Sequence, residues 1–223
     1  MQVKLVSITE PIIEGILSPE DFISYCARVS NPSNQANTQT APKLLKYLID
    51  HKHWSPMEMV SMTFEIKTFR AIAAQILRHR SFSFQEFSQR YSNITDFESF
   101  EIRKQAEKNR QSSTDLLDLN EENTEAIKQY LIAGATLYEN LLQKGAAKEC
   151  ARMVLPQCTQ TTMYMNGNVR SWIHYIDLRT KEDTQKEHRE IAQAIKETFI
   201  QIFPNISEAL NWKSGLPNEQ NLI

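Results

Sequence analysis

An alternating segment followed directly by a helical one constrains the fold most strongly. In EMVSMTFEI, residues 58–66, one face is uniformly apolar and consists of Val60, Met62, Phe64 and Ile66. This period of two predicts a half-buried strand. The residues that follow, 69–80, change to helical spacing, with one apolar stripe of Phe69, Ile72, Ala73, Ile76 and Leu77. The change of period predicts a sheet that helices flank.

The remaining elements follow in an irregular order. Strands are expected at 2–8 and 158–165, the second closed by the turn signal NGN at 166–168. Helices are expected at 19–29, 41–53, 121–144, 147–155, 169–179 and 184–202. We expect a capping box from Thr184 to Glu187 to open the last helix. The polar stretch 92–123 is expected to be irregular or a loosely packed helix.

Glycine is scarce, and this limits both the fold and the ways of binding phosphate. The chain has only five glycines, and neither GxGxxG nor GxxxxGK[ST] occurs. No βαβ rhythm is visible. We therefore expect a single α+β domain over residues 1–223, with a central, largely antiparallel sheet flanked by helices and a helical portion, and not a Rossmann fold. Side chains such as arginine must then bind any phosphate.

Composition excludes several classes of function. The formal net charge is −2, so nothing global draws the chain to nucleic acid or to an anionic membrane. No apolar run approaches ~18 residues, and the start has no signal-peptide pattern. The three cysteines, Cys26, Cys150 and Cys158, lack metal-ligand spacing. A reduced, cytoplasmic setting is expected.

The segment RHRSFSFQEFSQRY, residues 78–91, carries the strongest chemical signal. It follows a helix on which Gln75 shares a face with Arg78 and His79. If the segment then becomes extended, Glu86, Ser88 and Arg90 lie on one side. A helix end and a strand could then bring several arginines to one ligand, because guanidinium forks suit phosphate, carboxylate or imide groups.

Two other interpretations of the segment stay open from the residues alone. One is an internal salt-bridge network that joins Arg78 or Arg90 to Glu86. The other is a nucleic-acid patch with interleaved aromatic side chains, which predicts binding that falls steeply with salt.

Position for position, the segment resembles the RHRxxSxxxxSxRY signature of the flavin-dependent thymidylate synthases. All seven fixed positions are filled, by Arg78, His79, Arg80, Ser83, Ser88, Arg90 and Tyr91. Further stretches resemble the same family in the same order: ARVS at 27–30, HWSPMEM at 53–59, ARMVLPQ at 151–157 and NVRSWIHYIDLR at 168–179. The resemblance runs from about residue 20 to 200.

The resemblance implies an enzyme that makes dTMP from dUMP. It implies 5,10-methylenetetrahydrofolate as carbon donor, FAD as cofactor and NADPH as reductant, with no protein nucleophile. It also implies a homotetramer whose active sites are shared between subunits, and no nucleic-acid or membrane partner. A relative of this family that has lost activity and serves as a scaffold is the remaining alternative.

The resemblance also implies two sets of site residues. Those for dUMP are Gln75, Arg78, Glu86, Ser88, Gln89, Arg90, Arg152 and Arg179. Those for FAD are Ser30, His53, Ser55, Arg78, His79, Arg80, Glu86, Asn168, Arg170 and His174. Arg179 is the expected catalytic residue, because a guanidinium beside the uracil imide favours its ionised form. Arg170 and His174 share one helical face opposite an apolar stripe, as expected for a helix beside a cofactor.

Some positions depart from the family pattern or suggest other chemistry. Met59 stands where the family usually has histidine, and Tyr175 replaces the usual helix aromatic. Cys158 in LPQC resembles the nucleophile setting of the flavin-free synthases, but no histidine follows it, so a structural thiol is expected. His51 and His53 have no third ligand at suitable spacing, so no metal site is expected.

Overall fold

The computed structural model describes residues 1–93 and 96–213. Its strands are β1 (Gln2–Ile8), β2 (Ser61–Phe69), β3 (Ser83–Glu86), β4 (Arg103–Gln105), β5 (Ser113–Leu116) and β6 (Gln160–Asn168). Its helices are α1 (Pro19–Ala27), α2 (Ala41–Asp50), α3 (Arg70–Ile76), α4 (Glu121–Gln143), α5 (Lys148–Ala151), α6 (Val169–Arg179), α7 (Lys186–Ile202) and α8 (Pro204–Ala209). Short 3₁₀ helices are η1 (Pro32–Asn34), η2 (Ser55–Met59) and η3 (Arg152–Val154).

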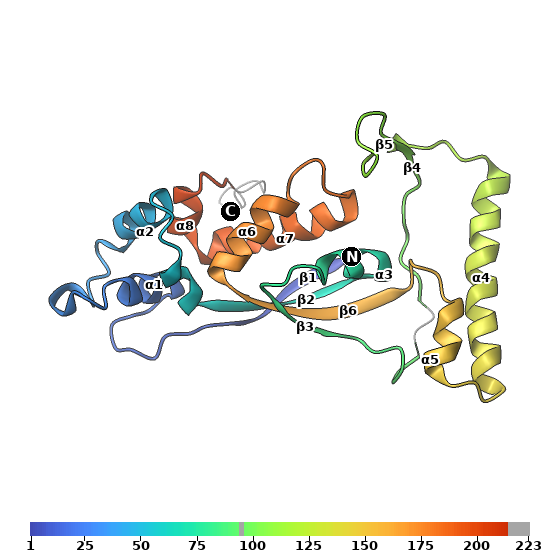
Figure 1. Ribbon diagram of the computed structural model, residues 1–223, viewed down its shortest axis with the longest axis horizontal. Coiled ribbons are helices and arrows are strands. Elements are labelled where there is room, and N and C mark those ends of the chain that lie inside the picture. The colour runs from blue at the N-terminus through green and yellow to red at the C-terminus, as the bar shows by residue number, and fades with distance from the viewer. Residues whose placement is uncertain (94–95, 214–223) are drawn as a thin grey trace, which may run out of the picture.

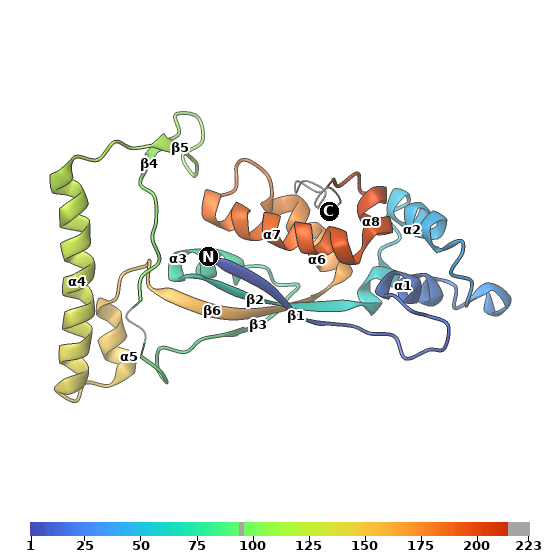
Figure 2. The ribbon, with the colours of Figure 1, turned by 180° about the vertical axis from the view of Figure 1, so that it is seen from behind.

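Four strands form the central sheet, in the order β1-β2-β6-β3, and every neighbouring pair is antiparallel. Helices α6 and α7 lie over one face of this sheet (Figure 1). Helices α1, α2 and α8 gather at one end, while α4 and α5 stand at the other end (Figure 2). The predicted α+β fold with an antiparallel sheet flanked by helices is confirmed, and no helix of the described residues is long and apolar enough to cross a membrane.

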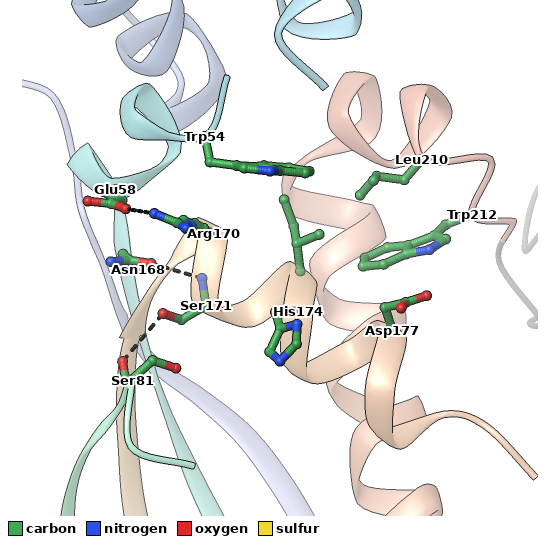
Figure 3. A pocket seen from close by; sticks show the side chains of 11 residues that line it. Trp54, Glu58, Ser81, Asn168, Arg170, Ser171, His174, Asp177, Leu210 and Trp212 are labelled. Atoms are coloured by element: carbon green, nitrogen blue, oxygen red, sulfur yellow. Dashed lines mark hydrogen bonds and ion pairs between the residues drawn. The ribbon is translucent and has the colours of Figure 1, made fainter. Parts of the chain in front are cut away.

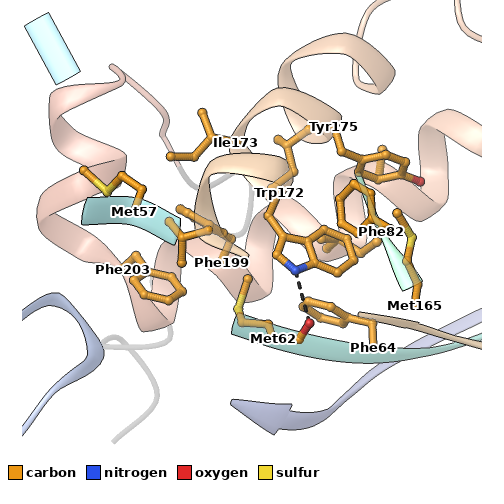
Figure 4. Packing of buried hydrophobic residues seen from close by; sticks show 14 of the residues in the cluster. Met57, Met62, Phe64, Phe82, Met165, Trp172, Ile173, Tyr175, Phe199 and Phe203 are labelled. Atoms are coloured by element: carbon orange, nitrogen blue, oxygen red, sulfur yellow. Dashed lines mark hydrogen bonds between the residues drawn. The ribbon is translucent and has the colours of Figure 1, made fainter. Parts of the chain in front are cut away.

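The alternation in the second strand produces the core. Met62, Phe64 and Ile66 are each fully buried, as predicted. They pack beneath α6, where the edge of Phe64 meets Trp172 at a ring-centroid distance of 5.0 Å (Figure 4). Trp172 also donates its indole N–H to the carbonyl oxygen of Met62, at 3.3 Å. The buried indole therefore fixes the height of α6 above the sheet.

Close packing overturns the turn predicted at 166–168. Strand β6 continues through these residues, and Gly167 pairs with Met62 of β2. A Cβ atom at Gly167 would lie 2.4 Å from the ring of Phe82. Glycine is required here because an aromatic ring presses on the strand, not because the chain turns.

Three further local predictions were wrong in detail. Helix α3 ends at Ile76, and Leu77 is 39% exposed rather than part of the buried stripe. The 92–123 stretch is mostly irregular, one of the two predicted alternatives, but it also contains the β4–β5 hairpin, and its described residues form no helix before α4. No capping box opens α7, because the hydroxyl of Thr184 donates to the carbonyl of Leu178 and Glu187 pairs with Arg103.

The extended run predicted through 86–91 was also wrong. Strand β3 stops at Glu86, and the amide of Tyr91 donates to the carbonyl of Ser88 in a turn. Arg78 and Arg80 therefore precede β3, whereas Arg90 follows it. Within one chain, the basic residues of this segment lie at opposite ends of the strand rather than at one corner.

Candidate functional site

Arg179 and His79 form the contact at the centre of the candidate site. Arg179 ends α6, His79 follows α3, and the guanidinium Nε donates to His79 Nε2 at 2.8 Å. Because that nitrogen must accept, His79 carries its proton on Nδ1 and is neutral. Burial, assisted by Arg179 and His174, lowers the pKa of His79 to about 4. The two terminal nitrogens of Arg179 form no hydrogen bond with a described residue, so they are available to a ligand.

Two further cations lie beside this contact. Arg78 and Arg80 flank His79, are exposed, and form no salt bridge within residues 1–93 and 96–213. The salt-bridge network considered for Arg78 therefore does not form within the described chain. Unpaired guanidinium groups on a protein surface are suited to phosphate oxygens.

A pocket of about 820 Å³ opens along α6 (Figure 3). Asn168, Arg170 and His174, all predicted for FAD, line it, together with Ser81, which follows Arg80. Asn168 caps α6 by accepting from the amide of Ser171 at 2.8 Å. Arg170 pairs with Glu58 of η2. The polar face of α6 thus faces the pocket, while Val169, Trp172 and Ile176 are fully buried as predicted. Ile173 is buried too, but it also lines the pocket.

The same pocket has aromatic walls that the sequence analysis did not identify. Trp54 and Trp212 both line it, and Figure 3 shows their rings on two sides of the opening. Their indole faces provide flat apolar surfaces suited to a planar ring system. Trp54 follows His53 in the HWSPMEM stretch, so the sequence contained a signal for it. Trp212 lies outside every motif, and only the fold places it beside the pocket.

A second group of predicted residues lies beyond β3. Ser88 and Arg90 line a separate pocket of about 450 Å³ that also includes Lys148. Arg90 pairs with Glu149 at 3.2 Å, and Arg152 Nε donates to the carbonyl oxygen of Glu149 at 3.3 Å. Glu149 therefore gathers two of the predicted nucleotide-binding arginines.

Two other residues predicted near the nucleotide, Gln89 and Glu86, are buried and half-buried respectively. Gln89 is 7% exposed, and its amide nitrogen is buried without a hydrogen-bond partner among the described residues. Glu86 pairs with Arg70 at 2.8 Å and accepts from Thr161 at 2.8 Å. A salt bridge of Glu86 with Arg78 or Arg90, the alternative considered from the sequence, is therefore replaced by one with Arg70.

Four other predicted residues line neither of these pockets: Gln75, Ser30, His53 and Ser55. Gln75 donates to Gln185 at 2.7 Å and accepts at His188, so both ends of its amide are used inside the chain. Ser30 lines another pocket, of about 490 Å³. His53 is exposed near Tyr47, at a ring-centroid distance of 5.9 Å, and Ser55 opens η2.

Cys158 has the character of a structural thiol. It is 8% exposed, and burial raises its pKa. A raised pKa leaves little thiolate at neutral pH, so the position is poorly suited to nucleophilic attack. Among the described residues, no group of three histidine, cysteine or acidic side chains is placed to hold a metal ion.

Known proteins resemble this chain over most of its length. Residues 12–205 match the family described as "Thymidylate synthase complementing protein". A "Probable flavin-dependent thymidylate synthase" of Paramecium bursaria Chlorella virus 1 is 52% identical over 215 residues, which cover 95% of this chain and 100% of that protein. A "Flavin-dependent thymidylate synthase" of Synechocystis is 52% identical over 219 residues, with the same two shares.

The fold is also similar to that of a solved structure. The "UMP/dUMP methylase PolB from Streptomyces cacaoi bound with 5-Br dUMP" superimposes with a TM-score of 0.80 and 25% identity, covering 94% of each chain. The family match and the two full-length relatives agree with the signature at 78–91. The chain therefore belongs to the thymidylate synthase complementing protein family, that of the flavin-dependent thymidylate synthases.

Proposed function

We propose that this protein methylates dUMP to dTMP in the cytoplasm, as a single domain. The carbon comes from 5,10-methylenetetrahydrofolate, and the hydride comes from FAD that NADPH has reduced. A methylene carbon needs two electrons to become a methyl group, so the folate is released as tetrahydrofolate. The names of the two relatives and the methylase with a similar fold support this reaction.

The observation that carries the proposal is the way in which one contact holds Arg179 and leaves its terminal nitrogens open. A neutral His79 holds its Nε, and its terminal nitrogens have no described partner. A guanidinium fixed at one nitrogen and open at the other two is suited to two parallel hydrogen bonds with a planar ligand. Next to the uracil imide, its charge favours the ionised ring and makes the ring carbon more nucleophilic.

The residues along α6 fit a flavin cofactor. The pocket of about 820 Å³ lies in the size range of cofactor sites, and Trp54 and Trp212 give it flat walls. Asn168, Arg170 and His174 would hold the ring system by hydrogen bonds, while Arg78 and Arg80 would bind the diphosphate. When bound and reduced, the flavin supplies the hydride, and the protein supplies orientation and charge. The proposed FAD contacts are completed by His53, Ser55, Ser30, His79 and Glu86.

The nucleotide phosphate is assigned to the residues beyond β3. Arg90 and Arg152 would form charge-assisted hydrogen bonds with it once Arg90 exchanges the exposed carboxylate of Glu149 for phosphate. Ser88 and the backbone at Gln89 would add donors, and Gln75, Arg78 and Glu86 complete the proposed set. Gln75 would use the second N–H of its amide, because the first donates to Gln185. No step needs a nucleophile from the protein, because the ionised uracil ring itself attacks the carbon donor.

A homotetramer with shared sites accounts for the separation of these groups. Within one chain, Arg179 contacts His79, which precedes β3, whereas Arg90 follows β3 and lines a pocket that contains neither of these residues. Helix α4 stands apart from the sheet (Figure 1) and exposes Tyr130, Ile132 and Leu137. With the loop at 97–102 it lines an apolar groove of about 780 Å³. A second copy of the chain would cover this groove and bring its own half of the site.

The experiment that tests the function is a complete reconstitution. The purified protein is mixed with FAD, dUMP, 5,10-methylenetetrahydrofolate and NADPH, and dTMP is measured by chromatography. We expect dTMP only when all components are present, with equal amounts of dTMP and tetrahydrofolate. Formation of dTMP without FAD, or none in the complete mixture that contains folded, flavin-loaded protein, would refute the proposal.

A further inference from the structure

A chain of hydrogen bonds crosses the core behind Arg179. His188 of α7 is fully buried, and its Nε2 lies 3.1 Å from the hydroxyl of Tyr175. Its Nδ1 lies 3.3 Å from Oε1 of Gln75. Gln75 Nε2 in turn donates to Gln185 Oε1 at 2.7 Å. This chain of hydrogen bonds therefore joins α6, α3 and the start of α7 through side chains alone.

A salt bridge at its far end determines the direction of every bond. Arg103 of β4 holds Glu187 at 2.7 Å, and the ionised carboxylate can only accept. Gln185 must then donate its amide nitrogen to Glu187, at 2.9 Å, and turn its oxygen toward Gln75. Gln75 must donate to that oxygen and offer its own oxygen to His188.

The direction of these hydrogen bonds determines which atoms of His188 and Tyr175 carry a proton. His188 must carry a proton on Nδ1 to donate to Gln75, so as a neutral ring it accepts at Nε2 from the Tyr175 hydroxyl. Burial, with Arg179 and His79 nearby, lowers the pKa of His188 to about 3, which keeps the ring neutral. Burial raises the pKa of Tyr175, so its hydroxyl keeps the proton that it donates.

Tyr175, at the end of this chain of hydrogen bonds, packs against the contact between His79 and Arg179. The ring of Tyr175 is fully buried and meets the ring of His79 edge-on, with centroids 4.8 Å apart. His79 in turn accepts from Arg179 at 2.8 Å. Fixing the hydroxyl of Tyr175 restricts its ring, and the ring limits where His79 can hold the guanidinium.

We propose that His188 is a positioning residue for Arg179, acting through Tyr175 and His79, and that it touches neither substrate nor cofactor. The inference rests on the proposed function, in which Arg179 acts on the uracil ring. A buried polar chain gives little net stability over apolar side chains of similar size, whereas its single direction restricts each member to one orientation. Misplacing a catalytic group by about 1 Å can cost ~100-fold in rate, so small rotations matter.

The test compares variants at His188 with a core control. His188→Gln keeps an acceptor for Tyr175, whereas the double variant Tyr175→Phe and His188→Leu removes both partners of that bond. We expect the double variant to bind FAD normally and to lose roughly tenfold in kcat, with less than about threefold change in KM for dUMP. His188→Gln should recover most of kcat. Ile195→Val, also fully buried on α7, serves as the control for ordinary loss of packing.

A second measurement does not depend on the variants folding or on turnover. In wild-type protein labelled with ¹⁵N-histidine, NMR at pH 7 should show His79 and His188 neutral and protonated on Nδ1. Protonation of His188 on Nε2, or a charged His188, would overturn the inference. So would an unchanged kcat in the double variant, or an equal loss in Ile195→Val at matched stability. Failure of the wild type to form dTMP would instead refute the proposed function itself.

Discussion

At the scale of single residues, the proposed reaction depends on a guanidinium held by a neutral imidazole. His79 can accept from Arg179 only while its Nε2 is unprotonated, and burial keeps it so. The arrangement leaves a positive charge whose two terminal NH₂ groups have no hydrogen-bond partner among the described residues. Such a group contributes most when negative charge develops next to it during the reaction.

Removing this guanidinium should separate binding of the cofactor from chemistry. Arg179→Ala is expected to keep FAD and to lose dTMP formation by about 100-fold or more, because charge stabilisation at the uracil is lost. Flavin absorbance and single-turnover dTMP formation measure the two effects. The matched control is Arg110→Ala, an exposed arginine of the β4–β5 hairpin, which should behave like the wild type. Turnover close to wild type in Arg179→Ala would remove Arg179 from its catalytic role.

Two histidines predict a dependence of stability on pH: His188 is fully buried and His79 is half-buried. The pKa is lowered from 6.5 to about 4 for His79 and to about 3 for His188. Between pH 6.5 and these values the unfolded chain binds protons that the folded chain does not, so the free energy of unfolding falls as pH falls. Melting temperatures measured from pH 7 to 4.5 should decrease, with a shallower slope in His188→Gln. Ile195→Val, which removes a buried side chain but no titratable group, should keep the wild-type slope, and equal slopes in all three proteins would contradict the assignment.

Residue identities, but not their partners, could be predicted from the sequence. The motif at 78–91 and the helix at 169–179 pointed to Arg179 and His79 separately. Their contact depends on the end of α6 lying beside the segment after α3, and the two residues are 100 positions apart in the chain. Glu86 was expected near Arg78 or Arg90, yet Arg70 is its partner, because β3 and β6 place it beside the start of α3. His188 had no signal, because it belongs to no motif.

At the scale of elements, periodicity was reliable and local turn signals were not. The alternating strand and the apolar stripe of α6 were correct because each buries one continuous face against the other. The NGN turn and the capping box from Thr184 to Glu187 were wrong. In both places a tertiary contact, with Phe82 or with Arg103, determined the conformation that local propensity left open.

The glycine in β6 gives a sharp test of this packing. Gly167→Ala should destabilise the protein by ~1–3 kcal/mol, because the new Cβ would meet the ring of Phe82. Gly134→Ala in α4 is the matched control, since its nearest neighbour would lie at 3.7 Å. It should be neutral or stabilising by up to ~1 kcal/mol, as alanine favours helix. Urea unfolding measures both, and adding Phe82→Leu to Gly167→Ala should restore part of the loss. Equal stability of the two glycine variants would contradict the packing.

At the scale of the whole molecule, the position of α4 is unusual for a single chain. Four residues join each of its ends to the neighbouring element, β5 or α5, and it packs mainly on α5 and η3 (Figure 2). The helix itself was correctly predicted from its period, but the sequence did not indicate that it would stand away from the sheet. A helix with exposed apolar side chains gains stability when a second copy covers it.

Charging the groove beside α4 should therefore break the assembly and the shared site together. Ile132 is 51% exposed and lines the groove, so Ile132→Glu would place a carboxylate in an apolar contact between copies. Light scattering should show a smaller particle, with dTMP formation lost in parallel. Gln129→Glu adds the same charge outside the groove and should leave both unchanged. An Ile132→Glu protein that remains a fully active tetramer would exclude this face as an interface.

The most direct test of the central claim is the visible absorption spectrum of the purified protein, recorded with added FAD and dUMP before and after NADPH. We expect a protein-bound flavin spectrum that NADPH bleaches and that methylenetetrahydrofolate restores as dTMP forms. A protein that stays colourless and binds no added FAD would contradict the account, and the arginines of residues 78–91 would then need another ligand.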